Sequence, residues 1–359
     1  MTTLQRLPDR LRRILASGSL MTFWVLLIAL AVGAILLILT GHDPVLAYRE
    51  WIDRAILGQR GWQETIVKAT PLLFAGGAVL LALRAGVWNI GIDGQVLVGA
   101  LASAVVASEI NTSNRLVMWI AASLAGMLAG AAWAIIPALL RGRLGVNEIV
   151  TTIMFNYIAI SATAWLVKGP IGDPEVVVPQ TKLIPIDMRL PTFGETRVHL
   201  GLVFAVVIVL LLGVILSRTV AGMELSATGA NPRAASHGHV PVRGYITSAL
   251  ITSGALAALA GTNDVLSTKG VFQGEWNPSY GFVAFAVVFL GRKSVIGLIP
   301  AALVLGQLSY AADVVPRAAD VAPAFFDVIE GALLVTLAVT VIVRSTTNRR
   351  FEIADRSEQ

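Results

Sequence analysis

The sequence predicts an all-α membrane protein, a bundle of about ten transmembrane helices with both chain termini in the cytoplasm. Of its 359 residues, 56% are hydrophobic and only 14% are charged, whereas a soluble domain carries about a quarter of charged residues. Apolar runs of near-bilayer length recur along the chain, and a helix of about 20 residues spans the roughly 30 Å of the hydrocarbon layer. Basic residues gather in alternate connections, as expected of a chain that crosses a membrane repeatedly.

Ten apolar stretches are the candidate spans. They are 20–40, 64–83, 94–110, 116–140, 147–167, 199–217, 243–263, 280–291, 295–312 and 324–343. The first run follows four arginines, is too long for a signal peptide and lacks a cleavage site, so it is predicted to be a retained helix. The run 280–291 is too short to cross alone. It suggests a half-helix and leaves nine or eleven crossings open.

The distribution of basic residues supports this topology. With the N-terminus in the cytoplasm and ten crossings, the inside segments hold 16 of the 27 basic residues, as the positive-inside rule expects. The predicted domains are a cytoplasmic segment 1–19, a transmembrane domain 20–343 and a cytoplasmic tail 344–359. An outside loop, 168–198, contains five prolines and is predicted to be extended rather than helical.

Several classes of function are not supported. The chain has no cysteine, which excludes disulfides and thiolate metal sites, and its His237 and His239 lack acidic neighbours that would make a metal site. It has no P-loop and no hydrolase or metalloprotease motif, so no enzyme activity and no cofactor of its own are predicted. The net charge is +5, but the basic residues sit at helix ends rather than in one patch, and nucleic acid is not an expected partner.

The first informative polar segment is 88–95, which carries Asn89, Asp93 and Gln95 together with two glycines. A broken helix lining a cavity is one way to hold such groups at membrane depth. The alternative is an ordinary cytoplasmic turn in which Asn89 and Asp93 act as caps.

The second polar segment is 147–157. On a helix, Thr152, Asn156 and Thr163 share one face. That face could line a pore and bind a polar solute, or it could form hydrogen bonds to neighbouring helices. Glu148, at the cytoplasmic end, is interpreted as a capping or docking charge.

Two further features remain open from the residues alone. The cytoplasmic loop 218–242 is rich in small residues between Ser226 and Gly238 and suits either a short helix lying against another protein or a solvated loop. In the last span, Asp327 and Glu330 are candidates for a substrate or proton role. Exposure at the outer interface is the alternative for both.

In this order, these segments resemble the permease subunits of bacterial ATP-binding cassette (ABC) importers. The group is the branched-chain amino acid/ribose permease superfamily, nearest to its nucleoside and simple-sugar members. Asn89–Gly99 (NIGIDGQVLVG) is similar to the group's NIGxEGQ signature, with Asp93 in place of Glu. Asn147–Asn156 (NEIVTTIMFN) is similar to its second motif, Gly229–Arg243 to its coupling loop without the leading Glu, and Tyr280–Arg292 to its YGF…LLGR segment.

The resemblance implies a type II ABC importer-like permease of the bacterial cytoplasmic membrane. Its implied partners are a cytoplasmic ATPase that binds ATP and Mg²⁺, a second permease subunit (expected to be a homologous relative) and an extracytoplasmic solute-binding protein, besides membrane lipid. The implied solute is a nucleoside or related sugar-containing compound, with a simple sugar or another neutral polar solute as the alternative.

The resemblance also assigns residues. The expected substrate pathway comprises Asn89, Asp93, Gln95, Thr152 and Asn156. The expected ATPase-coupling loop includes Ser226, Gly229, Asn231, Arg233, Ala234, Ala235 and Gly238. Two rival functions remain: an ion-coupled secondary transporter, which needs an intramembrane charge such as Asp93, Asp327 or Glu330, and a structural membrane protein.

Overall fold

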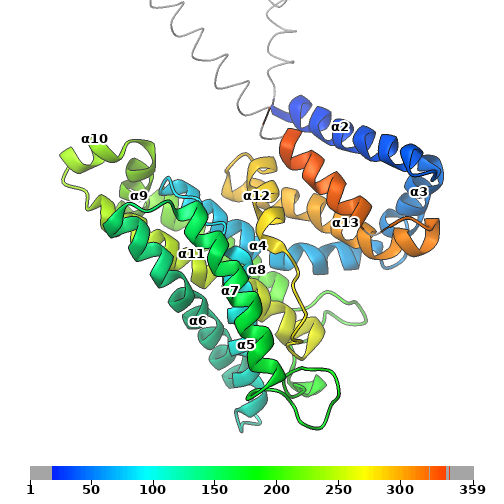
Figure 1. Cartoon of the computed structure of the whole chain (residues 1–359), viewed down its shortest axis with the longest axis horizontal. Coiled ribbons are helices and arrows are strands. Elements are labelled where there is room, and N and C mark those ends of the chain that lie inside the picture. The colour runs from blue at the N-terminus through cyan, green and yellow to red at the C-terminus, as the bar shows by residue number, and fades with distance from the viewer. Residues whose placement is uncertain (1–17, 323, 337–338, 340–359) are drawn as a thin grey trace, which may run out of the picture. The chain divides into compact units, whose positions relative to one another are not determined.

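The computed structural model describes residues 18–322, 324–336 and 339, and most of these are helical (Figure 1). Backbone contacts divide the chain into two compact units. The terminal unit combines the chain up to Gly61 with the chain from Leu308 onward, and the central unit is Trp62–Gln307. The two are described separately below.

The central unit holds the helices that carry the polar motifs. They are α4 (Gly61–Arg84), α5 (Ile92–Glu109), α6 (Arg115–Leu144), α7 (Glu148–Lys168), α8 (Gly201–Arg218), α9 (Val220–Ala230), α10 (Pro232–His237), α11 (Val242–Asp264) with the π-helical turn η4 (Val265–Lys269), α12 (Tyr280–Leu290) and the start of α13 (Val295–Ala319). The terminal unit holds α2 (Gly18–Leu39), α3 (Pro44–Trp51), the π-helical turn η2 (Ile52–Ile56), the end of α13 and a helix over 324–336.

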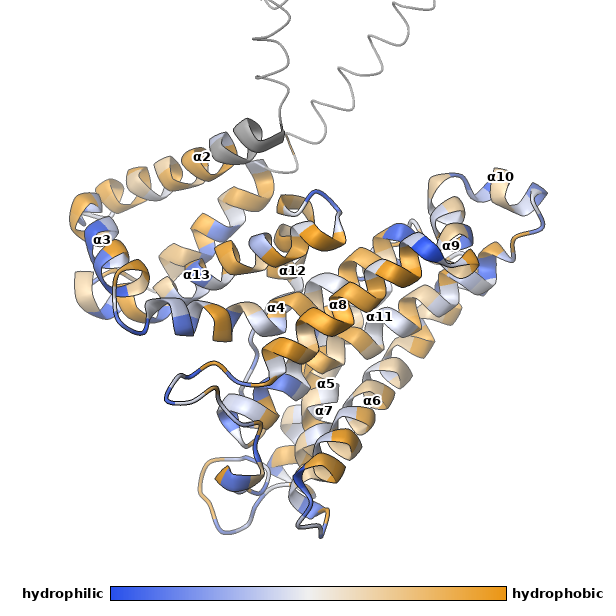
Figure 2. Cartoon of the chain, turned by 180° about the vertical axis from the view of Figure 1, so that it is seen from behind, coloured by the Kyte–Doolittle hydropathy of each residue, from blue (hydrophilic) through white to orange (hydrophobic). Residues whose placement is uncertain are grey.

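Seven described helices are long and apolar enough to cross a membrane. They correspond to the predicted spans that begin at residues 64, 94, 116, 147, 199, 243 and 295. The predicted spans 20–40 and 280–291 correspond to shorter apolar helices, and part of the predicted span 324–343 lies outside the described residues. Figure 2 shows apolar residues along the helices and polar residues mainly in the connections. The chain is therefore a multi-pass membrane protein, whereas the number ten and the orientation stay predictions.

Helix ends in the central unit follow local signals in the sequence. Asn114 precedes α6, and its side chain accepts hydrogen bonds from the backbone N–H groups of Leu116 and Val117. Gly145 ends the same helix in the left-handed conformation, with φ of 67°, which glycine adopts without strain. Asn147 then caps α7 through the N–H of Ile149 at 2.9 Å.

The core of the central unit is built from α5, α6 and α11, which pack together through small residues. Gly130 on α6 lies against Gly254 and Ala258 on α11, and a Cβ atom at Gly130 would lie 2.5 Å from the Ala258 Cβ. Gly99 on α5 meets the same alanine. Small residues at these crossings allow the backbones to approach closely, which is how membrane helices gain van der Waals contact without help from water.

The long connection between α7 and α8 is pinned to the chain that follows α11. The backbone N–H groups of Thr181, Ile184 and Leu190 donate to the carbonyls of Phe272, Gly270 and Leu266. Ile184, Leu190 and Phe272 also join the buried cluster of this region. The prediction of an extended, turn-rich loop is confirmed, apart from one short 3₁₀ helix at Ile186–Met188.

The small-residue crossing predicts a specific sensitivity. Gly130→Ala should destabilise the folded protein by about 1–3 kcal/mol, because the new methyl group overpacks a contact made partly of backbone. The measurement is the thermal unfolding midpoint of purified protein in detergent. Gly77→Ala is the matched control, because a Cβ at Gly77 would find its nearest neighbour, Leu212, at an ordinary 3.6 Å. Equal midpoints for the two variants would contradict this packing.

Candidate functional site

The connection between α4 and α5 forms a turn. After α4 ends at Arg84, Gly86 adopts a φ of 76°. The Asn89 side chain accepts a hydrogen bond from the N–H of Gly91 at 3.1 Å, and α5 begins at Ile92. The segment is therefore a turn that Asn89 closes with its own side chain, whereas its position on the cytoplasmic side stays a prediction.

The Asn89 side chain also forms hydrogen bonds that connect neighbouring helices, and it has no exposed surface. Its side-chain amide donates to Gln95 Oε1 at 2.9 Å and to Ser253 Oγ on α11 at 2.8 Å. Gln95 Nε2 donates back to Asn89 Oδ1 at 3.2 Å. The Ser253 hydroxyl in turn donates to the carbonyl of Ala78 on α4 at 2.8 Å. Asn89 and Gln95 thus tie α4, α5 and α11 together.

Three side chains of α7 hold the backbone of the same segment. Asn156 Oδ1 accepts from the Gly94 N–H and its Nδ2 donates to the Ile90 carbonyl, both at 2.8 Å. Thr152 Oγ1 accepts from the Ile90 N–H at 3.3 Å, and Glu148 Oε1 accepts from the Trp88 N–H at 3.3 Å. Residues 148, 152 and 156 repeat every four positions and so lie along one helix face. We call these three side chains the α7 clamp.

The α7 clamp shows what the polar side chains of the second polar segment, 147–157, bond to in this structure. Thr152 and Asn156 do bond to a neighbouring segment, as the helix–helix interpretation expects, and contact with a solute stays a prediction for them. Thr163, on the same face, bonds to the Ala159 carbonyl of its own helix. Glu148 is buried, accepts a hydrogen bond from the Trp88 N–H and pairs with Arg141 Nε at 3.2 Å.

Asp93 does not cap its own helix. Its Oδ1 atom accepts a hydrogen bond from the N–H of Gly281, 188 positions away, at 2.7 Å. Gly281 lies in the first turn of α12, where unpaired N–H groups and the helix dipole favour a negative charge. A Cβ at Gly281 would lie 2.6 Å from Asp93 Oδ2, so glycine is what lets the carboxylate approach.

The helix that Asp93 binds is the predicted half-helix. The run 280–291 forms α12 (Tyr280–Leu290), 11 residues long. An extended segment leads into it from η4, drawn in yellow in Figure 1. Trp88 stacks on Phe285 of α12, with ring centroids 5.6 Å apart and planes inclined by 17°. The segment 88–95 therefore contacts α7, α11 and α12, and Ser253 of α11 links it to α4.

A second buried polar cluster escaped the sequence analysis. Tyr280 Oη donates to Asp264 Oδ2 at 2.5 Å at the end of α11. The neighbouring Asn263 and His199 are both buried and lie beside Gly201. The signal was the string Thr262-Asn263-Asp264, which interrupts an apolar run, but the predicted span ended at 263. Within the described residues no group of three or more His, Asp or Glu could hold a metal ion.

The predicted coupling loop folds as two short helices that meet at Asn231. Asn231 caps α10 by accepting hydrogen bonds from the N–H groups of Arg233 and Ala234, both at 3.1 Å. Ser226 bonds to the Gly222 carbonyl within α9. Arg233, Ala234 and Gly238 are exposed and could meet a partner protein, but Ala235 is only 7% exposed and packs inward.

The α9–α10 loop touches the chain just before the polar segment, backbone against backbone. A Cβ at Gly229 would lie 2.2 Å from the carbonyl oxygen of Arg84, and one at Gly86 would lie 2.9 Å from the Gly229 Cα. Neither glycine can be replaced without displacing the other chain segment. The sequence predicts that the 88–95 segment and the 218–242 loop are functional, but it does not predict that the two regions of the chain touch.

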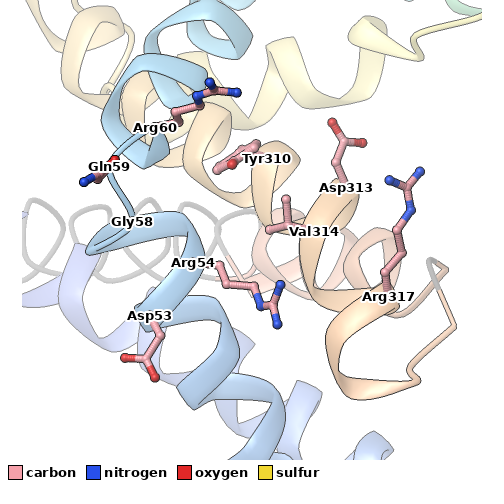
Figure 3. A pocket seen from close by; sticks show the side chains of 9 residues that line it. All are labelled: Asp53, Arg54, Gly58, Gln59, Arg60, Tyr310, Asp313, Val314 and Arg317. Atoms are coloured by element: carbon pink, nitrogen blue, oxygen red, sulfur yellow. The ribbon is translucent and has the colours of Figure 1, made fainter.

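The terminal unit contains a separate charged pocket of about 620 Å³. Figure 3 shows Tyr310 and Val314 of α13 between Arg54 and Arg60 on one side and Arg317 on the other. Arg54 pairs with Glu50 at 2.5 Å. In the helix 324–336, Asp327 is exposed and Glu330 is hydrogen-bonded to Ser309.

The α7 clamp predicts a stability effect. Asn156→Leu should cost about 2–4 kcal/mol, because it leaves two backbone groups of the turn without partners. The thermal midpoint in detergent measures this loss. Thr151→Val is the matched control, since the Thr151 hydroxyl bonds only to carbonyls at the start of its own helix. A variant at Asn156 as stable as this control would rule out the clamp.

His199, which precedes α8, predicts a dependence on pH. Burial lowers the pKa of its imidazole from 6.5 to about 4. The unfolded chain therefore binds a proton below about pH 6.5 while the folded chain does not, so folded-state stability falls as the pH drops from 6.5 towards 4. Thermal midpoints across this range should fall further for the natural chain than for His199→Gln. Parallel pH profiles would contradict the assignment.

Known proteins match this chain along most of its length. The family model for the branched-chain amino acid transport system permease component matches residues 62–338. The "Glucose ABC transporter permease protein TsgB13" of Haloferax volcanii is 34% identical over 88% of this chain and 85% of its own length. The "Guanosine ABC transporter permease protein NupP" of Bacillus subtilis is 30% identical over 89% and 92%, respectively. The "Nucleoside ABC transporter permease protein NupB" of Lactococcus lactis is 28% identical over 87% and 88%. The family's matched region contains the turn at Asn89, the α7 clamp, the α9–α10 loop and α12, and the chain belongs to this family of membrane permease components.

Proposed function

We propose that this chain is the membrane subunit of an ABC importer and forms the translocation pathway for a nucleoside or a related sugar-containing solute. Support comes from relatives named for guanosine, nucleosides and glucose, each aligned over more than four fifths of this chain. A largely uncharged interior also fits a neutral polar solute. ATP hydrolysis would take place on a partner ATPase.

The backbone contact between Gly229 and Gly86 carries the mechanism. Closure of the ATPase subunits on ATP would push the α9–α10 loop. Because Gly229 presses directly on the Arg84–Gly86 backbone, the push would reach the turn at Asn89 and, through the α7 clamp, α7 itself. The bundle would then exchange an outward-facing for an inward-facing arrangement, as a shift between two states of different ligand affinity.

The proposed orientation has both termini in the cytoplasm of a bacterial cell, with the chain in the cytoplasmic membrane. It places α9, α10 and the Arg141–Glu148 pair on the cytoplasmic side, in agreement with the basic inside segments. It places the charged pocket of Figure 3 on the outer side. There its arginines would take part in docking an extracytoplasmic solute-binding protein.

The remaining partner is a second permease, which we propose to be a homologous chain rather than an identical copy. The pathway would then lie between the two permeases. The proposed solute contacts in this chain are Asn89, Asp93, Gln95, Thr152 and Asn156. In the conformation described here their polar groups bond within the chain, so a solute would meet them after a rearrangement of the clamp.

A simple sugar or another neutral polar solute is the second candidate, because one relative is named for glucose. An ion-coupled transporter is a weaker candidate. Of the charges it would need, Asp93 is already bound to the α12 N-terminus, although the buried Asp264 is an additional carboxylate.

The test is reconstitution of the chain in proteoliposomes with its ATPase, second permease and binding protein. Uptake of labelled nucleosides and sugars should require ATP and the binding protein. Uptake by this chain alone, driven by an ion gradient, would overturn the proposal. A solute screen of the binding protein would separate nucleosides from sugars.

The exposed surface of α10 generates a prediction on coupling. Arg233→Glu and Gly238→Glu should lower solute uptake per ATP hydrolysed at least fivefold without changing thermal stability, because both positions are exposed. Ala235 is a poorer probe, since a charge there would also disturb buried packing. Arg143→Glu, an exposed charge reversal on α6 outside the loop, is the control. Normal coupling in the two α10 variants would exclude this loop as the docking site.

A further inference from the structure

The face of α7 opposite the clamp differs from the other exposed helix faces of the central unit. The clamp and Thr163 occupy one side of α7, and the other side is open. An open depression of about 500 Å³ runs along that side. Its lining residues all belong to α7 and are Met154, Tyr157, Ile158, Ser161, Ala162 and Trp165.

Polar groups form a regular stripe within this face. Tyr157, Ser161 and Trp165 follow each other at intervals of four residues, so they lie in one row with about 6 Å of helix rise between neighbours. All three are exposed, Tyr157 at 65% and Trp165 at 67%. We call this row the α7 stripe.

The polar groups of the stripe form no hydrogen bond among the described residues of the chain. The threonines of the same helix behave differently, since Thr151, Thr152 and Thr163 all bond to carbonyls of α7. Polar groups without partners are costly in hydrocarbon. The stripe is therefore poorly suited to face lipid.

The exposed faces of α6 and α8 supply the contrast. Between Arg115 and Arg143 of α6, the large exposed side chains are Leu116, Val117, Ile120, Leu124, Leu128, Ile135 and Ile136. On α8, before Ser217 and Arg218 at its end, they are Val203, Phe204, Val207, Leu210, Leu211, Val214 and Ile215. Between the helix ends these faces are apolar, as expected for lipid contact. An interfacial position would explain Trp165 alone, but Tyr157 and Ser161 lie near the middle of α7.

We propose that the α7 stripe lines the solute pathway, with Tyr157 and Trp165 as stacking surfaces for a ring-bearing solute and Ser161 as a hydrogen-bonding group between them. This inference rests on the proposed function and names its solute-contacting surface. Because α7 supplies every lining residue of the depression, the facing wall belongs to the second permease. Aromatic faces stack on nucleobases and on the apolar faces of sugars, and the free hydroxyl and N–H groups bind polar substituents.

The stripe also differs from the pathway that the sequence suggested. Thr152 and Asn156 lie on the opposite, clamped side of α7. Both sides can act in one cycle, since the clamp positions the helix whose other side meets the solute.

Thiol labelling tests the surface without knowledge of the solute. The natural chain has no cysteine, so single replacements can be compared directly. In the assembled transporter, Ser161→Cys should react with a charged, water-soluble thiol reagent at least tenfold faster than Leu128→Cys. Leu128 is 69% exposed on the apolar face of α6. It lies at about the same level as Ser161, because Trp133 of α6 packs against Phe155 of the antiparallel α7. Equal rates would overturn the proposal.

Uptake kinetics test the stacking. Trp165→Leu should raise the KM for solute at least fivefold, and Tyr157→Phe should raise it less because the ring remains. Phe204→Leu, an exposed aromatic on the apolar face of α8, should leave the KM unchanged. An unchanged KM in all three variants would refute the stacking role. If the natural complex imports neither nucleosides nor sugars, the proposed function fails, and thiol labelling still decides whether the stripe faces water.

Discussion

The central unit depends on one constraint. The backbone N–H and C=O groups of an irregular turn need hydrogen-bond partners from the protein where water is scarce. The turn at 88–91 cannot supply all its own hydrogen bonds, as a helix would. Side chains of α7 provide them instead, with Asn156 binding Ile90 and Gly94 while Thr152 and Glu148 bind Ile90 and Trp88. The polar motif in α7 and the polar turn therefore require each other.

Small residues provide the second requirement, which is close approach of the helices. Gly99, Gly130 and Gly254 bring α5, α6 and α11 near enough for Asn89 to reach Ser253. Gly281, which has no side chain, likewise allows the Asp93 carboxylate to approach the first turn of α12 closely. A half-helix with a carboxylate at its N-terminus is electrostatically stabilised at that end. This arrangement accounts for a helix of 11 residues inside a membrane bundle.

Much of the fold could be predicted from the sequence because hydrophobic runs and caps are local signals. The spans from α4 to α8 are predicted to within a few residues. Partners distant in sequence could not be predicted, because nothing near Asp93 indicates Gly281 and nothing near Gly86 indicates Gly229. Periodicity placed Thr152 and Asn156 on one face of α7 but could not say whether that face is buried. In the structure, the side of α7 with Thr152 and Asn156 bonds to the 88–95 segment, and the side with Tyr157 and Trp165 is exposed.

The contact between Gly86 and Gly229 has a mechanical consequence. Side chains at an interface can change rotamer and so accommodate a small displacement of one segment against the other. Here main chain lies on main chain, so no change of rotamer can relieve the contact, and relief requires rotation about backbone φ and ψ angles. A displacement of α9 would therefore act directly on the backbone of the α4–α5 turn, with no side chain between them.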